Sequence, residues 1–221
     1  MMLLRNMGSD VRAKNTYGET ALHIAARCGN RNIVRLLIAR GFDLADTDNL
    51  GNNALHWAAK GQNPEIVLDL LESNPNLVNN RCITWQSPLH LATTWGNARV
   101  VQALLWRGAQ AQATDDFGMT PLHCAAKQGD TQIAEMILQD ERVDVNAEDH
   151  LGRTPLYIAC EWYNREVVDM LLRIPGVSKR GLKDWHLDPL APSSLEVRDP
   201  HGPGWELIRP PRPTNLKSRN P

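Results

Sequence analysis

A seven-residue motif recurs five times along this chain of 221 residues. Its copies read TALHIAA at 20–26, NALHWAA at 53–59, SPLHLAT at 87–93, TPLHCAA at 120–126 and TPLYIAC at 154–160. Successive copies start 33 or 34 residues apart. A fixed period of this size is typical of stacked supersecondary units, each of which buries its apolar faces only against its neighbours. The sequence therefore predicts a repeat architecture.

Each copy predicts a pair of short helices. Thr120 before Pro121 is typical of a helix start, because a hydroxyl caps the first amides and proline is tolerated at the first helical position. The same place is taken in the other copies by Thr20, Asn53, Ser87 and Thr154. Gly129 predicts the end of that helix, and Ile133 and Ile137 give the next one an apolar face. Polar turns such as DDFG at 115–118 predict a hairpin-like finger between repeats.

Composition argues against several classes of function. The net charge of −1 and the pI near 6.7 give no basic footprint for nucleic acid. No apolar run approaches the roughly 18 residues of a membrane span, so we expect no membrane insertion. The four cysteines form no CxxC pair, which favours a reducing intracellular location, cytoplasmic with the nucleus as the alternative. There is no GxSxG elbow and no glycine-rich phosphate loop, so we expect neither an enzyme nor a cofactor.

The motif TPLHxAA, the apolar run thirteen positions after its Thr, and the GxDV or DVN element that follows resemble the ankyrin repeat over about residues 3–174. This resemblance implies an all-α solenoid of stacked helix–turn–helix repeats with β-hairpin-like fingers. The expected boundaries are a partial repeat at 1–14, then repeats at 15–47, 48–81, 82–114, 115–148 and 149–176, the last one incomplete. Residues 177–221 are rich in proline and predict a mostly disordered tail.

Both ends of the chain leave alternatives open. The residues before the first repeat match the end of a repeat that lacks its first helix. Either the chain is a piece of a longer array, which we favour, or Leu3, Leu4 and Met7 form an improvised cap. In the tail, the run IRPPRP at 208–213 is either a polyproline-II ligand for an SH3-type groove or a linker.

The resemblance implies that a protein partner binds a concave face made of the finger tips and the solvent side of each first helix. Carried across position by position, the candidate partner-binding residues are Tyr17, Arg27, Leu50, Lys60, Trp85, Trp95, Phe117, Lys127, Leu151 and Trp162. Exposed aromatic side chains are typical of interface hot spots, and a row of exposed aromatics and leucines is an apolar patch of the kind that marks contact sites. The alternative is that the tip residues pack on neighbouring fingers. We interpret Trp57 and Trp106 as packing residues.

Four histidines recur at the repeat period, which raises the question of a metal site. Equivalent positions in a stack lie about 10 Å apart, whereas zinc needs ligand nitrogens about 2.1 Å from one ion. We therefore expect no metal. The resemblance implies a structural role instead, in which each histidine bonds the motif hydroxyl and ties adjacent repeats together. The structural motif residues are then Thr20, His23, His56, His90, Thr120, His123 and Thr154, with Tyr157 replacing the last histidine.

A modification site is a weaker possibility. The segment from Leu138 to Asn146 reads LxxxxxDVN, which resembles the site of an asparaginyl hydroxylase in ankyrin-repeat proteins and would make Asn146 the target. The same residues are ordinary repeat consensus.

The resulting functional expectation is a monomeric, non-catalytic adaptor that binds a protein of unknown identity. Two alternatives remain. The chain is the targeting portion of a larger enzyme or channel, which the incomplete first repeat supports. Or it regulates a transcription factor, similar to NF-kappa-B inhibitors, which the five-repeat size and the long finger before SPLHLAT support and the absence of an acidic tail opposes.

Overall fold

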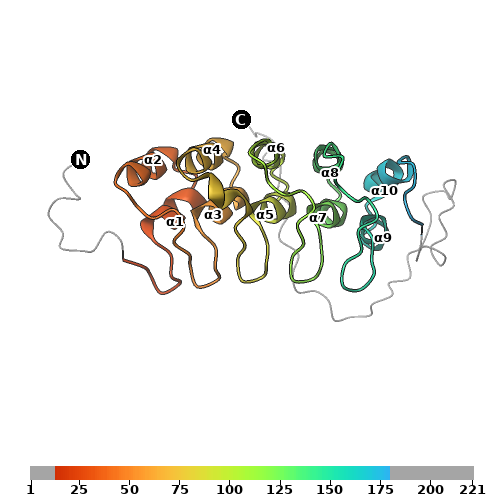
Figure 1. Ribbon diagram of the computed structural model, residues 1–221, viewed down its shortest axis with the longest axis horizontal. Coiled ribbons are helices and arrows are strands. Elements are labelled where there is room, and N and C mark those ends of the chain that lie inside the picture. Colours follow the sequence, from red (N-terminus) through yellow and green to blue (C-terminus); the bar gives the residue numbers. More distant parts are fainter. Residues whose placement is uncertain (1–12, 180–221) are drawn as a thin grey trace, which may run out of the picture. The chain divides into compact units, whose positions relative to one another are not determined.

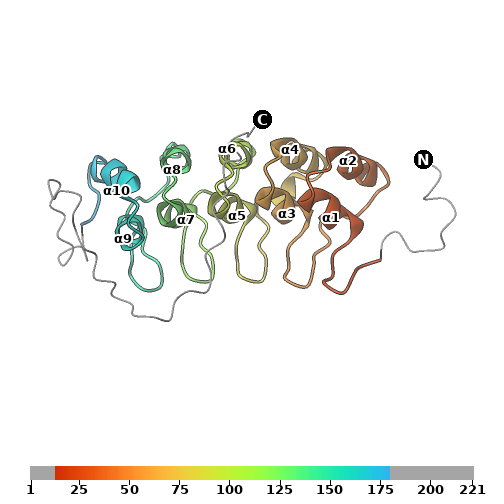
Figure 2. The same cartoon turned by 180° about the vertical axis from the view of Figure 1, so that it is seen from behind.

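The computed structural model of the protein describes residues 13–179. In this range the helices come in pairs that stand side by side in chain order (Figure 1), and Figure 2 shows the same order from behind. The first helices of the pairs form one layer: α1 (Ala21–Arg27), α3 (Ala54–Lys60), α5 (Pro88–Thr94), α7 (Pro121–Gln128) and α9 (Pro155–Glu161). The second helices form the other layer: α2 (Arg31–Ala39), α4 (Pro64–Ser73), α6 (Ala98–Trp106), α8 (Thr131–Leu138) and α10 (Arg165–Leu172).

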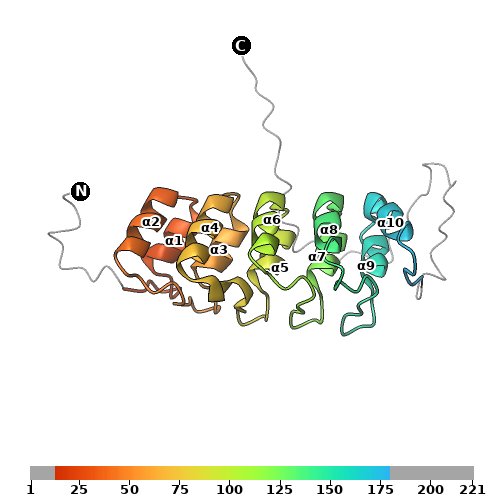
Figure 3. The same ribbon diagram turned by 45° about the horizontal axis from the view of Figure 1, so that its top comes forward.

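The expected all-α stack is confirmed. Residues 13–179 contain no β-strand, and the fingers are turns rather than paired strands. A short 3₁₀ helix, η1 (Pro75–Asn79), follows α4 in the segment where the second repeat has one extra residue. Seen from above in Figure 3, successive pairs repeat the same arrangement. The partial repeat expected at the N-terminus lies almost wholly outside the described residues. The tail beyond Lys179, including IRPPRP, lies wholly outside them, and the repeat boundaries stay a prediction.

The core runs along the interface between the two layers. The leucine of each motif copy is almost completely buried at Leu22, Leu55, Leu89, Leu122 and Leu156. The small alanines that follow each leucine allow neighbouring first helices to approach closely, and α1 contacts α3, α3 contacts α5, α5 contacts α7, and α7 contacts α9. Each repeat therefore depends on its neighbours for burial.

The first described repeat keeps one apolar side uncovered. Ile33 of α2 is 44% exposed, although the residues at its position in the following repeats are fully buried. Ile24 and Leu36 are exposed beside it. No element among residues 13–179 covers this side.

Each motif histidine connects its own helix cap to the next repeat. The Nδ1 atom of His123 accepts the Thr120 backbone N–H at 3.1 Å and lies 2.9 Å from the Thr120 hydroxyl. With Nδ1 as acceptor, Nε2 carries the proton and donates to the Arg153 carbonyl at 2.9 Å. Two other motif histidines make the same bonds to carbonyl oxygens one repeat further on: His23 to Asn52 at 3.1 Å and His90 to Met119 at 3.1 Å. A neutral imidazole thus ties one repeat to the next.

The second repeat has an electrostatic conflict at this cap. Asn53 replaces the hydroxyl residue, and its Oδ1 lies 2.8 Å from Nδ1 of His56. This oxygen accepts the backbone N–H groups of Leu55 and His56, and as an amide oxygen it cannot donate. If Nδ1 carried the proton, the unprotonated Nε2 would face the Gln86 carbonyl at 3.3 Å. In either tautomer of the neutral ring, two acceptors face each other.

Replacing Asn53 by threonine should therefore stabilise the protein. The hydroxyl donates to Nδ1 and removes the repulsion, which should raise the free energy of unfolding by about 1 kcal/mol, the usual worth of one hydrogen bond. Urea denaturation followed by circular dichroism measures the change. Ser87→Thr is the matched control, because it exchanges one hydroxyl for another. An Asn53→Thr variant that is no more stable than the parent contradicts this account of the cap.

Candidate functional site

The five fingers share one backbone geometry. In each, the backbone N–H of the first turn residue donates to the carbonyl of the fifth: Asn15 to Glu19, Asp48 to Asn52, Cys82 to Gln86, Asp115 to Met119 and Asp149 to Arg153, at 2.9 to 3.1 Å. In four fingers the side chain of the first residue also accepts two backbone N–H groups of the turn. The fingers are therefore fixed by their own hydrogen bonds before any partner binds.

Neighbouring fingers are also bonded to each other. The tip carbonyl of one finger accepts a backbone N–H from the next: Tyr17 from Asn49 at 3.0 Å, Leu50 from Ile83 at 3.0 Å, Thr84 from Asp116 at 3.3 Å and Phe117 from His150 at 2.9 Å. These bonds satisfy the backbone of the tips and leave the side chains free to point away. Hydrogen bonds therefore hold the main chain of the finger tips in place, while the tip side chains remain exposed to solvent.

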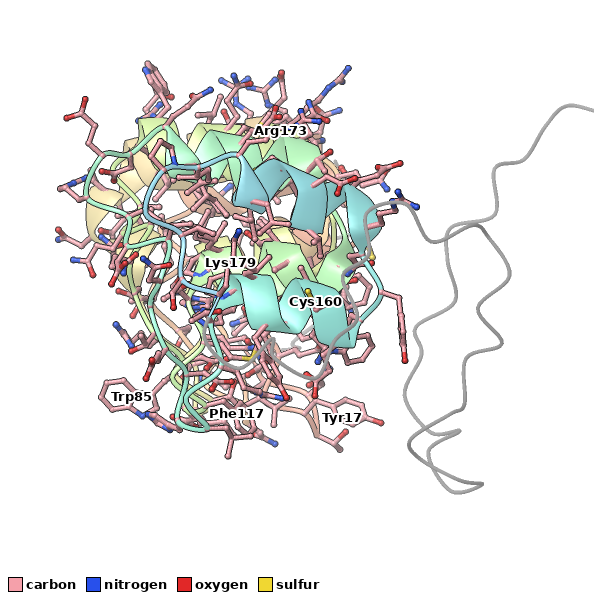
Figure 4. The ribbon with its side chains drawn as sticks, turned by 90° about the vertical axis from the view of Figure 1, so that its right-hand side faces the viewer. Tyr17, Trp85, Phe117, Cys160, Arg173 and Lys179 are labelled. Carbon is pink, nitrogen blue, oxygen red and sulfur yellow. The ribbon has the colours of Figure 1, made fainter. Side chains whose placement is uncertain are left out.

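The tip side chains form an apolar row in water. Tyr17, Leu50, Phe117 and Leu151 occupy one register of the turn and are 56 to 75% exposed. Figure 4, viewed along the row of helices, shows Tyr17, Trp85 and Phe117 on the same side of the molecule, opposite to Arg173 at the end of α10. This exposure argues against the alternative in which the tip residues pack on neighbouring fingers.

The third finger departs from the common pattern at two positions. Cys82 stands where the other fingers have Asn or Asp, and its Sγ lies 3.0 Å from the Thr84 hydroxyl. Trp85 stands at the turn glycine position with φ +56°, in the left-handed region that strains an L side chain. Its indole is 57% exposed and lies under the Arg81 guanidinium, 5.2 Å from the ring centroid. Strained residues that a fold retains are candidates for function.

Trp85→Gly should make the protein more stable. Glycine adopts the left-handed conformation without strain, so we expect the free energy of unfolding to rise by about 1 kcal/mol. Urea denaturation measures the change. A loss of stability would instead show that the indole contributes more to packing than the turn loses to strain.

A second set of candidate residues lies on the first helices and touches the fingers. Arg27 Nη1 at the end of α1 lies 3.2 Å from Glu19 of the first finger. Arg153 of the last finger lies 3.1 Å from Glu161 of α9. These contacts place the C-terminal ends of the first helices and the fingers on the same side of the molecule. We call this surface the finger face: the tip residues Tyr17, Leu50, Trp85, Phe117 and Leu151, and the first-helix residues Arg27, Trp57, Lys60, Trp95, Lys127 and Trp162.

One end of the finger face carries two cations on a single indole. The Lys60 ammonium lies 4.2 Å from the centroid of the Trp57 ring, and the Arg27 guanidinium of the preceding repeat lies 5.2 Å from it. The indole N–H donates to Asp48 at 3.0 Å, which fixes the ring. Cation–π contacts of this kind are stronger when the cation is desolvated. The sequence interpretation of Trp57 as a packing residue therefore missed half of its role, because the ring packs against the core and also holds two cations.

The charged groups next to this cluster, Asp48 and Lys60, interact with their surroundings in opposite ways. Burial alone would raise the pKa of the Asp48 carboxyl, but hydrogen bonds from Asn52, Leu50 and Trp57 outweigh it and lower the pKa. Burial lowers the pKa of Lys60, and Asp48 opposes this effect. Across the described residues no carboxylate forms an ion pair with Lys60.

The other end of the finger face also has a lysine ammonium group against an indole ring. The Lys127 ammonium of α7 lies 4.7 Å from the centroid of the Trp162 ring in the next repeat. Trp95, at the end of α5 between these two clusters, is 56% exposed. Both tryptophans stand at the helix C-cap, where the chain turns away and leaves the ring in solvent.

Trp106 is exposed to solvent, so the prediction that it packs was wrong. It was expected to pack, but it is 75% exposed at the end of α6, with the Arg107 guanidinium 5.0 Å from its ring centroid. It lies two residues after the buried Leu104, so the helix turns it away from the core. It belongs to the second-helix layer and not to the finger face.

Asn146 is engaged on both sides of its amide. Its Nδ2 donates to the Gly176 carbonyl at 2.9 Å, and its Oδ1 accepts the Ser178 backbone N–H at 2.7 Å. Hydroxylation stays a prediction.

Within residues 13–179, the other polar sites consist of groups that are already paired or buried. A hollow of about 570 Å³ is lined by loops at 79–81, 108–114 and 140–142. Its two arginines already have partners: Arg81 donates to the Thr114 carbonyl at 2.6 Å, and Arg142 pairs with Asp140 at 2.7 Å.

Burial raises the pKa of the Cys124 thiol to about 12, which makes it a poor nucleophile at neutral pH. The part of the chain that is described has no cluster of three or more His, Cys, Asp or Glu side chains suited to a metal. None of its helices is long and apolar enough to cross a membrane.

Comparison with known proteins identifies a family model that covers the stack and relatives that cover part of it. A family model described as ankyrin repeats (3 copies) matches residues 1–81 and 86–180. An ankyrin repeat protein of fowlpox virus (strain NVSL) is 31% identical over 126 residues, which is 57% of this chain and 87% of the relative. Ankyrin repeat and SOCS box protein 3 of Bos taurus is 34% identical over 128 residues, 57% of this chain and 24% of that protein. The nuclear factor NF-kappa-B p105 subunit of Gallus gallus is 39% identical over 83 residues, 35% of this chain and 8% of that protein. The chain thus spans most of the viral relative but less than a quarter of the other two.

Proposed function

Because the chain belongs to the ankyrin-repeat family, whose repeats generally mediate protein–protein interaction, we propose that it is a non-catalytic module that binds a protein partner through the finger face. The observation that carries this proposal is the row of exposed apolar side chains held on a finger backbone with hydrogen bonds within and between the fingers. Exposed apolar patches of this kind mark contact sites. A backbone that is already ordered adds little entropy cost on binding.

The experiment is an affinity purification that compares the parent with a Trp95→Ala, Phe117→Ala double variant. The proposal predicts that a partner captured by the parent is lost from the double variant, while helical circular dichroism is unchanged. Trp106→Ala is the matched control, because it removes an exposed tryptophan from the other layer. A partner list that is unchanged in the double variant contradicts the proposal.

The cysteines support a reducing intracellular location as part of the proposal. All four are free thiols, and Cys82, Cys124 and Cys160 are buried. Fluorescence imaging of the tagged full chain tests the location.

A second candidate function is the regulation of a transcription factor, and the similarity to the p105 subunit favours it. Mixing the purified chain with purified NF-kappa-B tests it. Size-exclusion chromatography that shows a shared peak supports this candidate, and separate peaks at micromolar concentration exclude it.

The third candidate is a targeting portion of a larger protein. The SOCS box protein and the tyrosine-protein kinase Shark of Drosophila melanogaster support it, since the chain spans 24% and 13% of these relatives. Sequencing of full-length transcripts would show whether the reading frame continues into further domains.

A further inference from the structure

The charged groups of the finger face are unevenly distributed. Among its first-helix residues, Arg27, Lys60 and Lys127 carry positive charge. Glu161, which takes the same motif position in the last repeat, is bonded to Arg153. Arg27 already has Glu19 as its partner. Lys60 and Lys127 form no ion pair with any carboxylate in the described part of the chain, and each has an indole beside it instead.

These two ammonium groups are prepared to bind anions. Each is partly buried and lies against an indole ring, Lys60 against Trp57, which its bond to Asp48 holds in place, and Lys127 against the more exposed Trp162. Part of their side-chain freedom is therefore already lost before binding. The pKa of Lys60 is lowered by burial, which means that the ammonium has lost part of its hydration. A carboxylate placed there would replace the missing water with a charge-assisted hydrogen bond.

The spacing of the two ammonium groups limits the shape of the ligand. Lys60 lies in the second repeat and Lys127 in the fourth, with the exposed Trp95 in the third. Packed helices lie about 8–10 Å apart, so one repeat separates Trp95 from each lysine by about 9 Å and the lysines by about 18 Å. A polyproline-II segment rises about 3.1 Å per residue with about three residues per turn, so one turn matches one repeat. Residues i, i+3 and i+6 of such a segment then face the three sites in order.

We propose that the finger face takes up an acidic linear segment of its partner, with two carboxylates six residues apart on Lys60 and Lys127 and an apolar side chain midway on Trp95. This inference rests on the proposed function, since it names the partner class of the same surface. The preferred pattern is Asp or Glu, two residues of any kind, an apolar residue, two residues of any kind, and again Asp or Glu.

The test is selection from a phage library of random peptides of about twelve residues, long enough to hold the pattern of about seven residues, on the immobilised full chain. The inference predicts that the parent enriches peptides with that pattern. It also predicts that a Lys60→Glu, Lys127→Glu variant enriches basic residues at the same spacing. Arg99→Glu, which reverses one positive charge on α6, outside the finger face, should select the same peptides as the parent. Peptides without acidic enrichment, or no enriched peptide at all, overturn the inference.

Affinity measurements on the most enriched peptide separate this inference from the proposed function. By fluorescence anisotropy, Lys60→Met and Lys127→Met should each weaken binding about tenfold, because each keeps the aliphatic stem and loses one charge-assisted bond. Arg99→Met should leave the affinity within about twofold, a few tenths of a kcal/mol. If Trp95→Ala abolishes binding while both Lys→Met variants bind like the parent, the finger face is the binding surface but its ligand is not acidic. If Trp95→Ala also binds like the parent, the proposed function fails together with the inference.

Discussion

Lowering the pH from about 7 to about 4.5 should reduce the free energy of unfolding by several kcal/mol, at about 1.4 kcal/mol per pH unit for each buried histidine that stays neutral. The four motif histidines are buried, and desolvation lowers the pKa of each below its usual 6.5, that of His56 to about 4. The unfolded chain therefore takes up protons between pH 6.5 and the folded-state pKa values, while the folded chain does not. Stability is full above pH 6.5 and falls as the pH drops through this window.

The carboxylates act in a lower window. Hydrogen bonds and arginines lower the pKa of Asp69 and Asp140 below 3.8, so their contribution is present above that value and is lost only at more acid pH. A loss of stability between about pH 6.5 and pH 4.5 therefore reports the histidines.

Urea denaturation at a series of pH values measures this effect, and His56→Gln is its control. The amide of glutamine is able to donate to the Gln86 carbonyl but does not titrate. The variant should be less stable at neutral pH, and its further loss on acidification should be smaller than that of the parent by about 2–3 kcal/mol. A parent whose stability is flat from pH 7 to pH 4.5 would show that the ring nitrogens are not held neutral between repeats.

Gly118→Ala should be strongly destabilising for a change that adds a single methyl group to a finger. Gly118 has φ +75°, and a Cβ atom there would lie 2.9 Å from the backbone nitrogen of His150 and 2.6 Å from its ring. The ring is exposed and able to move, but the backbone nitrogen is held by its bond to the Phe117 carbonyl. Left-handed strain of about 1–2 kcal/mol and overpacking of about 1–3 kcal/mol add to an expected loss of about 3 kcal/mol.

Gly41→Ala is the matched control for this change. Its φ is +70°, but nothing lies within 4 Å of the added methyl group, so only the backbone strain of about 1–2 kcal/mol remains. Urea denaturation of both variants gives the difference. Equal losses would mean that contact between the fourth and fifth fingers contributes little to the stack.

The architecture could be predicted from the sequence because its signals are local. The hydroxyl-proline helix starts, the glycines between the helices and the period of 33 or 34 residues each act within one repeat. The buried leucine of every motif copy follows from the same pattern. Trp106 was misjudged because it follows two leucines, although residues in its register elsewhere, such as Glu72 and Gln139, are polar and indicate a solvent position.

The finger face could be predicted only in outline. Its residues follow from their positions in the motif, but the pairing of Arg27 with Trp57 joins side chains thirty residues apart, and the motif marks Trp57 as a core position. The spacing of Lys60 three residues after Trp57 on one helix was a local signal for half of that cluster. The conflict between Asn53 and His56 depends on hydrogen positions that no sequence pattern contains.

Hydrogen–deuterium exchange of the full chain, with and without the most enriched phage peptide, tests most directly whether the finger face is the binding surface. We expect slower exchange in the turns at 48–52, 82–86 and 115–119 and at the C-terminal ends of α3, α5 and α7, with the second helices unchanged. Protection confined to α4, α6 and α8, with the fingers exchanging as in the free protein, would contradict the account.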